Sequence, residues 1–258
     1  MRARGRRLAA VFPLLAALLA PAAAGADSTL VQVNAGLLRI DGLKGTPSQV
    51  EVRYKTAAEA GFGGLTDRFL ITDESGLQAV GADCAAVSAT QASCSAVPVS
   101  TIEATLGDGD DLMVLNASKG DRVPRRFATD LSGGSGADVI RGGVGDDVMR
   151  GNAGRDVLAG WSGDDLLFGG SGTDGLLGFS GDDTLFGERG RDALFGQKGR
   201  DRMFGGPQND VLLARDGFRD PILNCGPGKR QRAITDWRDP RPNRCLQPGE
   251  RRKGKKKN

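Results

Sequence analysis

The chain has 258 residues and a formal net charge of +3, with 40 glycines, 5% aromatic residues and 26% charged residues. This composition is typical of disorder or of a repeat fold that uses glycine in its turns, and it argues against an ordinary globular core. The chain contains no histidine, no Gly-x-Ser-x-Gly elbow and no phosphate-binding loop, so we predict that it is not an enzyme. We also expect no nucleic-acid partner.

The first residues have the layout of a secretory signal. Four arginines precede an apolar run at 8–20, and Ala24-Gly25-Ala26 follows before Asp27. The alternative is a membrane anchor, but 13 apolar residues fall short of the roughly 20 that a spanning helix needs. We therefore expect residues 1–26 to be removed, no transmembrane segment, and a protein that is secreted, extracellular or associated with the cell surface.

Removal of this segment changes the net charge. The first 26 residues hold four arginines and no acidic residue, so the charge falls from +3 to about −1. Residues 251–257 carry six further Lys and Arg, and without them the body has a charge of about −7. Residues 248–258 are expected to be a disordered basic tail, for which an anionic cell-surface polymer is a candidate partner.

Residues 27–132 are predicted to form a small N-terminal β domain. Apolar runs at 30–40, 50–54 and 69–72 favour strands, and residues typical of turns separate them. Residues 107–114 look like a single degenerate copy of the repeat that follows. Asp111 of this copy is expected to lie out of register with Asp138, which makes a role in metal binding doubtful.

The glycine-rich middle of the chain, residues 133–213, repeats every nine residues without a change of register. All nine blocks begin with glycine, and eight have glycine at position four, with Gln208 as the exception. Position eight is always a large aliphatic residue, from Ile140 to Leu212. Position six is always aspartate, at Asp138, Asp147, Asp156, Asp165, Asp174, Asp183, Asp192, Asp201 and Asp210.

The recurring glycine and aliphatic positions of the repeat each have a physical reason. Glycine permits positive φ and close approach of one backbone to another, which tightly stacked turns require. A lone aliphatic residue between two variable ones indicates a very short strand with its centre facing inward. Because no block can bury its own apolar residue, the blocks must stack into a solenoid. A disordered Gly/Asp linker would not explain the aliphatic residue of position eight.

Stacking would place the aspartates of successive turns above one another in rows of like charge. A hard divalent cation with six to eight oxygen ligands suits a groove of carboxylates and backbone carbonyls, which favours Ca²⁺ over Zn²⁺ or a redox metal. The sequence GGSGADVIR at 133–141 resembles the GGxGxDxUx repeat of haemolysin-type (RTX) calcium-binding proteins, in which U is a large aliphatic residue. The resemblance covers residues 133–213.

The resemblance implies an all-β fold with a right-handed parallel β-roll, or β-solenoid, in which two blocks make one turn. It also implies that the nine position-six aspartates and carbonyls of the glycine turns hold calcium between a block and the next block but one. One row would run from Asp138 to Asp210 and the other from Asp147 to Asp201, with about seven Ca²⁺ sites.

These sites are not expected to be equally strong. Position five is acidic in three blocks, but it is arginine in three others, and a guanidinium near the ligand lowers cation affinity by repulsion. Lys198, Pro207 and Gln208 depart further from the pattern. We expect the best sites near Asp147, Asp165 and Asp183 and the poorest towards Asp201 and Asp210.

Position nine carries a second pattern that calcium does not explain. Phe168, Phe186 and Phe204 are expected to form one outward column. An exposed apolar ladder is usually covered, so the flanking domain or a second copy of the chain could pack there. The alternative interpretation is that these rings merely pack on one another along the sheet.

Four cysteines in an exported chain indicate two disulfides, with three pairings to choose from. Cys84–Cys94 and Cys225–Cys245 are favoured because each pair is close in sequence and outside the repeats. Residues 214–247 are predicted to form a C-terminal cap, tied by the second disulfide and free of metal, that closes the open end of the solenoid.

The combined interpretation is calcium binding by a secreted or cell-surface structural or adhesive protein whose array folds on extracellular calcium. Two alternatives stay open. The chain could be a partner-recognition module that acts through the N-terminal β domain, or a calcium-dependent secreted enzyme, which the lack of catalytic motifs disfavours.

Overall fold

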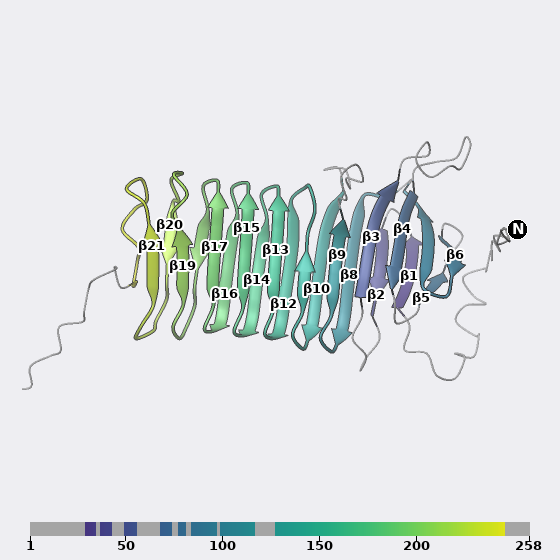
Figure 1. Ribbon diagram of the computed structural model, residues 1–258, viewed down its shortest axis with the longest axis horizontal. Coiled ribbons are helices and arrows are strands. Elements are labelled where there is room, and N and C mark those ends of the chain that lie inside the picture. Colours follow the sequence, from purple (N-terminus) through teal and green to yellow (C-terminus); the bar gives the residue numbers. More distant parts are fainter. Residues whose placement is uncertain are drawn as a thin grey trace, which may run out of the picture.

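The computed structural model describes residues 29–34, 37–42, 49–55, 68–73, 77–80, 84–96, 99–116 and 127–245. All regular elements in these ranges are β-strands, which lie side by side along the long axis of the molecule (Figure 1). The predicted signal segment 1–26 and basic tail 248–258 fall outside these ranges. Within them, the structure has no helix with the length and apolar character that a bilayer span requires.

The strands form two sheets, and in the repeats the chain alternates between them. The first sheet has the order β20-β18-β16-β14-β12-β10-β8-β2-β1-β5 and the second β21-β19-β17-β15-β13-β11-β9-β3-β4-β7-β6. The strands of the first sheet are β1 (Thr29–Asn34), β2 (Leu37–Asp41), β5 (Leu77–Val80), β8 (Thr101–Asp108), β10 (Ala128–Ser135), β12 (Asp147–Gly154), β14 (Leu166–Gly172), β16 (Thr184–Gly190), β18 (Arg202–Phe204) and β20 (Ile222–Asn224). Those of the second are β3 (Gln49–Lys55), β4 (Arg68–Asp73), β6 (Cys84–Ser88), β7 (Gln91–Ser95), β9 (Leu112–Asn116), β11 (Val139–Arg141), β13 (Val157–Ser162), β15 (Gly175–Ser180), β17 (Ala193–Lys198), β19 (Val211–Ala214) and β21 (Arg232–Thr235).

Neighbouring repeat strands are parallel, and equivalent block positions pair with each other. Leu167 pairs with Leu185, and Leu185 pairs with Met203 in the next turn. In the second sheet Leu158 pairs with Leu176 in the same way. Two blocks therefore make one turn, and the predicted parallel β-solenoid is confirmed.

The position-eight side chains form the core of the roll. All nine have 0% exposed area, while position seven lies outward, with Val139 and Val157 about two-fifths exposed at 37% and 41%. Burial of one such aliphatic side chain stabilises the fold by about 1.5–3 kcal/mol, but only when the next turn covers it. The inward-facing centre predicted for each short strand is thus confirmed.

Position two takes a positive φ in every block except the second, even where the residue is not glycine. Five such residues have φ between 66° and 81°, namely Asn152, Trp161, Phe179, Glu188 and Gln197. A residue with a side chain in the left-handed conformation costs about 1–2 kcal/mol. The stacked turns hold these five residues in that conformation despite the strain.

Replacing Glu188 with glycine is expected to stabilise the protein by about 1 kcal/mol, because it relieves the strain of a φ of 66° and the gain exceeds the entropy cost of glycine. Position 188 pairs with Gly170 in the preceding turn, so a glycine fits this column. Urea denaturation in calcium measures the effect. The control is Arg189→Gly, outside the positive-φ set, which should lose stability. A less stable Glu188→Gly variant would contradict the expectation.

The N-terminal strands extend the same two sheets. β2 pairs in parallel with β8, and β3 pairs in parallel with β9, as a further turn would. Beyond them β1 pairs antiparallel with β2 and β4 pairs antiparallel with β3, whereas β5 at the edge of the first sheet pairs in parallel with β1. The run predicted as a strand at 30–40 is divided between β1 and β2, which pair antiparallel with Val31 opposite Ile40, and both residues belong to the core. A domain boundary near residue 132 stays a prediction.

An aromatic cluster and a disulfide close the N-terminal end. Tyr54, Phe69 and Phe127 are buried together, with ring centroids 5.0–5.8 Å apart. Cys84 and Cys94 lie directly opposite each other on β6 and β7 and form a disulfide. The antiparallel strands thus cover what would otherwise be open ends of parallel sheets.

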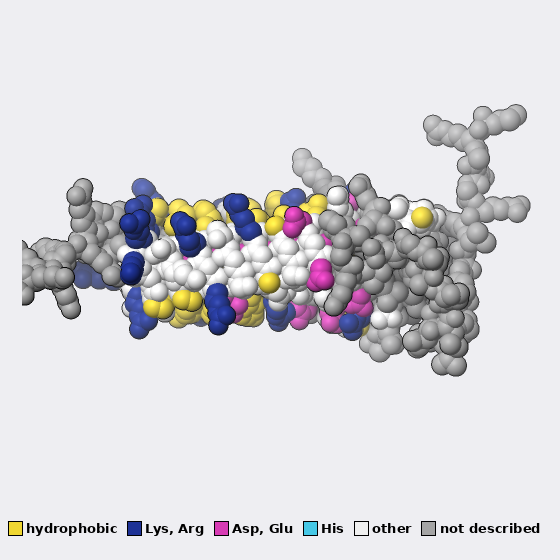
Figure 2. Space-filling model, turned by 90° about the horizontal axis from the view of Figure 1, so that it is seen from below, with side chains coloured by type: hydrophobic (Ala, Val, Ile, Leu, Met, Phe, Trp, Pro, Cys, Tyr) yellow, Lys and Arg dark blue, Asp and Glu magenta, His cyan; other side chains and the backbone are white. Residues whose placement is uncertain are grey.

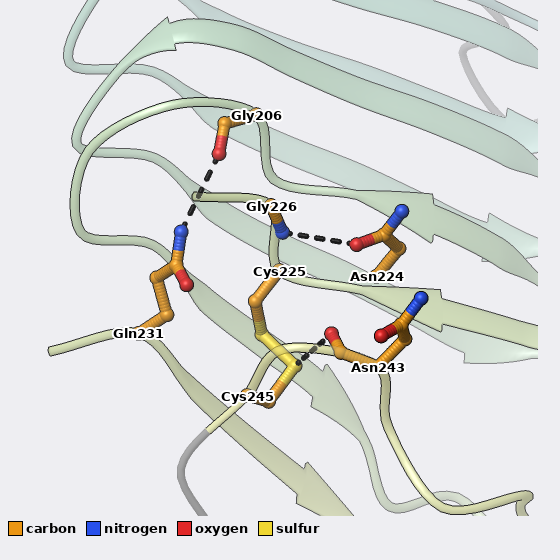
Figure 3. Close-up of a disulfide and its surroundings, with 7 residues drawn as sticks. All are labelled: Gly206, Asn224, Cys225, Gly226, Gln231, Asn243 and Cys245. Atoms are coloured by element: carbon orange, nitrogen blue, oxygen red, sulfur yellow. Dashed lines mark hydrogen bonds between the residues drawn. A yellow bond between two sulfur atoms is a disulfide. The ribbon is translucent and has the colours of Figure 1, made fainter. Parts of the chain in front are cut away.

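The C-terminal end is tied by the second disulfide. β20 and β21 carry the two sheets past the last block, and Cys225–Cys245 joins the turn after β20 to the chain after β21 (Figure 3). The Gln231 side-chain amide donates a hydrogen bond to the carbonyl of Gly206 at 3.4 Å. Both predicted disulfides and the disulfide-tied cap are confirmed.

The phenylalanines of position nine form the predicted column on the first sheet. Phe168, Phe186 and Phe204 are half-buried, and their rings stack at 5.1 and 4.8 Å between centroids. The Arg150 guanidinium lies over the Phe168 ring at 5.6 Å. The rings therefore pack on one another along the sheet, as the second interpretation expects. Self-association through this face stays a prediction.

Candidate metal centre

Two rows of buried aspartates line the two edges of the roll. The first row precedes the strands of the second sheet, and the second row lies at or just before the start of the strands of the first sheet. All of these aspartates have at most 2% exposed area. The first row consists of Asp111, Asp138, Asp156, Asp174, Asp192 and Asp210, and the second of Asp147, Asp165, Asp183, Asp201 and Asp220.

A ladder of hydrogen bonds connects the members of each row. Up to Asp192 in the first row and Asp201 in the second, the backbone N–H of each aspartate donates to Oδ1 of the aspartate one turn later, at 2.8–3.0 Å. The Asp220 N–H donates in the same way to Oδ1 of the less buried Asp239 at 3.0 Å. At the start of the second row the Thr129 hydroxyl donates to Oδ1 of Asp147. The ladder holds one oxygen of each carboxylate in place, which leaves the other oxygen to interact with something else.

That other oxygen, Oδ2, has no hydrogen-bond partner in eight of the nine position-six aspartates. The exception is Asp147, whose Oδ2 accepts from the Gly143 N–H at 2.9 Å. Leaving a buried charged oxygen without a partner costs several kcal/mol, so an array of them requires either protons or cations.

The unpartnered oxygens face oxygen-lined cradles beside the position-one glycines. A Cβ added to Gly151 would lie 2.3 Å from Oδ2 of Asp156 and 2.6 Å from the carbonyl oxygen of Gly169. The same pair of atoms recurs one turn later, where a Cβ on Gly169 would lie 2.7 Å from Oδ2 of Asp174 and 2.8 Å from the Gly187 carbonyl. Glycine is therefore needed at position one because a side chain would fill this space.

Burial is the main cause of raised pKa values in both rows. The pKa rises from 3.8 because desolvation disfavours the charged carboxylate, and neighbouring carboxylates add to the effect at most positions, while the backbone hydrogen bonds of the ladder oppose it. The pKa is about 6 at Asp138, Asp174 and Asp210, about 7 at Asp183, Asp192 and Asp220, about 8 at Asp201 and about 9 at Asp165, and it is also raised at Asp147 and Asp156.

The position-five side chains form an exposed layer outside the second row. Asp146 and Asp164 accept hydrogen bonds through Oδ1 from the backbone N–H of the residue one turn later, at 2.8 Å in both cases. Position five is Arg200 later along the second row and Arg191 beside Asp192 of the first row, and both arginines are exposed. On the face seen in Figure 2, acidic side chains lie towards the middle of the molecule and basic ones gather towards the C-terminal end.

The structure brings all nine predicted ligands into the two predicted rows and adds residues that sequence reasoning left out. The expectation that Asp111 lies out of register with Asp138 is wrong, because its N–H donates to Oδ1 of Asp138 at 2.9 Å and it occupies the next place in the first row. Asp111 lies 27 residues before Asp138, but the extra residues between β9 and β10 do not displace the strands. The sequence did contain a clue to this placement, because Asp111, Leu112 and Met113 have the residue types of block positions six, seven and eight.

Asp220 is also a row member, and its Oδ1 accepts from the Asp201 N–H at 2.8 Å. One extra residue separates these aspartates compared with the repeats, a spacing of 19 instead of 18. The Asp220-Pro221-Ile222 segment was recognisable as an aspartate–aliphatic pair, but the shifted register concealed its place in the row.

The donor set fits calcium. Each cradle offers carboxylate and backbone carbonyl oxygens, which are the hard ligands that Ca²⁺ prefers, and the chain contains no histidine to favour zinc. An ion there would meet the buried oxygens that otherwise have no partner. The position-six aspartates are the residues that would hold it.

Comparison with known proteins agrees with this donor set. A family model of the RTX calcium-binding nonapeptide repeat, built as four copies, matches residues 128–158, 142–176 and 177–212. No match was found among curated proteins. Across residues 128–212 the chain is therefore an array of RTX calcium-binding nonapeptide repeats.

Proposed function

We propose that this protein is a secreted or cell-surface structural or adhesive protein whose repeat array folds when it binds extracellular calcium. The observation that carries the proposal is the series of buried Oδ2 atoms without hydrogen-bond partners, each facing its own position-one glycine. Negatively charged carboxylates that are buried beside one another destabilise the folded roll unless cations or protons neutralise them.

The proposed ligands are the nine position-six aspartates, with carbonyl oxygens of the glycine turns. Between row neighbours from Asp138 to Asp210 and from Asp147 to Asp201 there are about seven gaps, each a candidate calcium site. The exposed carboxylates Asp146 and Asp164 lie beside the second row and would strengthen the sites near Asp165 by simple attraction.

Two features support a structural role outside the cell. The ligands recur at every turn along an elongated body, which is typical of a scaffold and not of a single reactive centre (Figure 1). Disulfides close both ends of the roll, and such bonds persist in oxidising surroundings. Calcium at the millimolar level found outside cells matches weak extracellular modules, with dissociation constants of about 10⁻⁴–10⁻³ M.

Far-UV circular dichroism of the purified chain in chelator, followed by calcium, tests this proposal. In chelator we expect a largely unordered spectrum, and about 5 mM calcium should produce a β-sheet spectrum with a cooperative melting transition. Magnesium at the same concentration is the control for ionic strength, and it should have little effect because it dehydrates reluctantly and demands regular octahedral geometry. The same spectrum and melting temperature with and without chelator would refute the proposal.

A further inference from the structure

Three carboxylates converge at the C-terminal end of the second row. Asp201 and Asp220 are row neighbours, and Asp216 lies in the turn that connects β19 to β20. One carboxylate oxygen from each residue lies within 4.8 Å of the other two. Among the residues that the structure describes, this is the group of three acidic side chains with the spacing of a metal site.

Each of the three residues has one oxygen engaged and one oxygen free. Oδ1 of Asp201 accepts from the Asp183 N–H at 2.9 Å, and Oδ1 of Asp216 accepts from the Phe218 N–H at 2.8 Å. Oδ1 of Asp220 accepts from the Asp201 N–H. The Oδ2 atoms of all three are buried without a hydrogen-bond partner, and the Asp201 and Asp220 residues are 0% exposed. The group is thus a set of fixed, partnerless carboxylate oxygens.

Asp216 distinguishes this place from the turns before it. Its block position is held by Ser162, Ser180 and Lys198 in the preceding turns of the same edge, so none of them supplies a third carboxylate. Asp216 is half-buried and borders a surface hollow that Lys198 and Arg215 also line. Lys198 and Arg215 would lower the affinity of a nearby cation site by repulsion, and the hollow places the Asp216 side of the group next to solvent.

We propose that Asp201, Asp216 and Asp220 form a calcium site of their own at the junction between the repeats and the cap. The site goes beyond the proposed function of the array, because Asp216 and Asp220 lie outside the matched residues 128–212. Three carboxylate oxygens without nitrogen or sulfur ligands suit a hard divalent cation. A site here would differ from the expectations of a metal-free cap and of a poor site near Asp201.

The site would fasten the cap to the last turn. Asp201 precedes β18 and Asp220 precedes β20, so one ion bridges two neighbouring strands of the first sheet. Asp216 adds the connection that leads from β19, which belongs to the second sheet. Calcium bound at this site would therefore stabilise the C-terminal end of the roll, where no further turn covers the last strands.

Calcium titration calorimetry of the full chain, with the variant Asp216→Asn, tests the site. Asparagine retains an oxygen that accepts from the Phe218 N–H, so the substitution removes the charge and the ligand but not the turn. We expect the variant to lose one binding event or to bind at this site at least about tenfold more weakly, because ligand charge sets calcium affinity. The control is Asp108→Asn, which removes one exposed carboxylate that accepts a hydrogen bond through Oδ1 from the Ser135 hydroxyl at 2.8 Å, and it should leave the titration unchanged.

The outcomes separate this inference from the function of the array. If Asp216→Asn and the wild type give the same titration while the array still binds calcium, the cap site is refuted and the array is not. If the wild type binds no calcium at all, both fail. Should the variant misfold, wild-type crystals soaked in terbium decide the matter. An anomalous peak among Asp201, Asp216 and Asp220 supports the site, and peaks confined to the repeats overturn it.

Discussion

Without calcium, the protein is expected to be much more stable at about pH 5 than at about pH 8, and calcium should reverse this order. Both rows hold carboxyl groups whose pKa values lie well above 3.8 in the folded chain, for example about 8 at Asp201 and about 9 at Asp165. At low pH these groups are protonated and burial costs little. At high pH they are charged, buried and close together.

Proton binding determines whether stability rises or falls with pH. Between the unfolded pKa of 3.8 and the raised folded values, the folded chain holds more protons than the unfolded chain, so its stability falls as the pH rises from about 4 to about 9. One pKa unit corresponds to about 1.4 kcal/mol, and all nine position-six carboxyls shift in the same direction, so a total change above about 5 kcal/mol is expected.

Thermal melting followed by circular dichroism, in calcium-depleted and calcium-saturated buffers at both pH values, measures the effect. With calcium, protons compete with the cation for the same oxygens, so the melting temperature should rise with pH. A melting temperature that rises with pH in the depleted buffer would show that the buried carboxylates are stabilised by something other than protons.

The variant Gly154→Ala is expected to lose the roll, at a cost of about 4 kcal/mol or more. Gly154 has a φ of 142°, and a Cβ at this position would lie 1.5 Å from the carbonyl oxygen of Gly136 in the preceding turn. The obstacle is backbone and not a movable side chain, so adjacent turns would have to separate. The same steric conflict recurs along the array, since a Cβ on Gly190 would lie 1.7 Å from the Gly172 carbonyl.

Gly175→Ala is the matched control for this prediction. A Cβ on Gly175 meets its nearest atoms at an ordinary 4.0 Å, and this block position already holds Val157 and Thr184 in other turns. The control should keep or gain up to about 1 kcal/mol of stability, because glycine weakens a strand interior. Urea denaturation in saturating calcium compares the two variants. Equal stability of both would mean that the close approach of the turns is not required.

The sequence by itself was sufficient for the repeat. The nine-residue period places one aliphatic residue inward and one aspartate at the turn, and the structure confirms both for every block from Asp138 to Leu212. Each strand is so short that its few residues decide which side chain faces the core. The favoured pairing of Cys84 with Cys94 also follows from local distance, because short loops bring their ends together at low entropic cost.

Only the tertiary structure decided which residues extend the rows and how the ends close. Asp111 and Asp220 occupy row positions although 27 and 19 residues separate them from their neighbours, because loops of different length can leave the strand stack unchanged. The convergence of Asp216 with Asp201 and Asp220 depends on contacts between turns, which no local pattern contains. The nine-residue period determines the structure of each turn, whereas the stacking of turns determines which side chains from different turns come into contact.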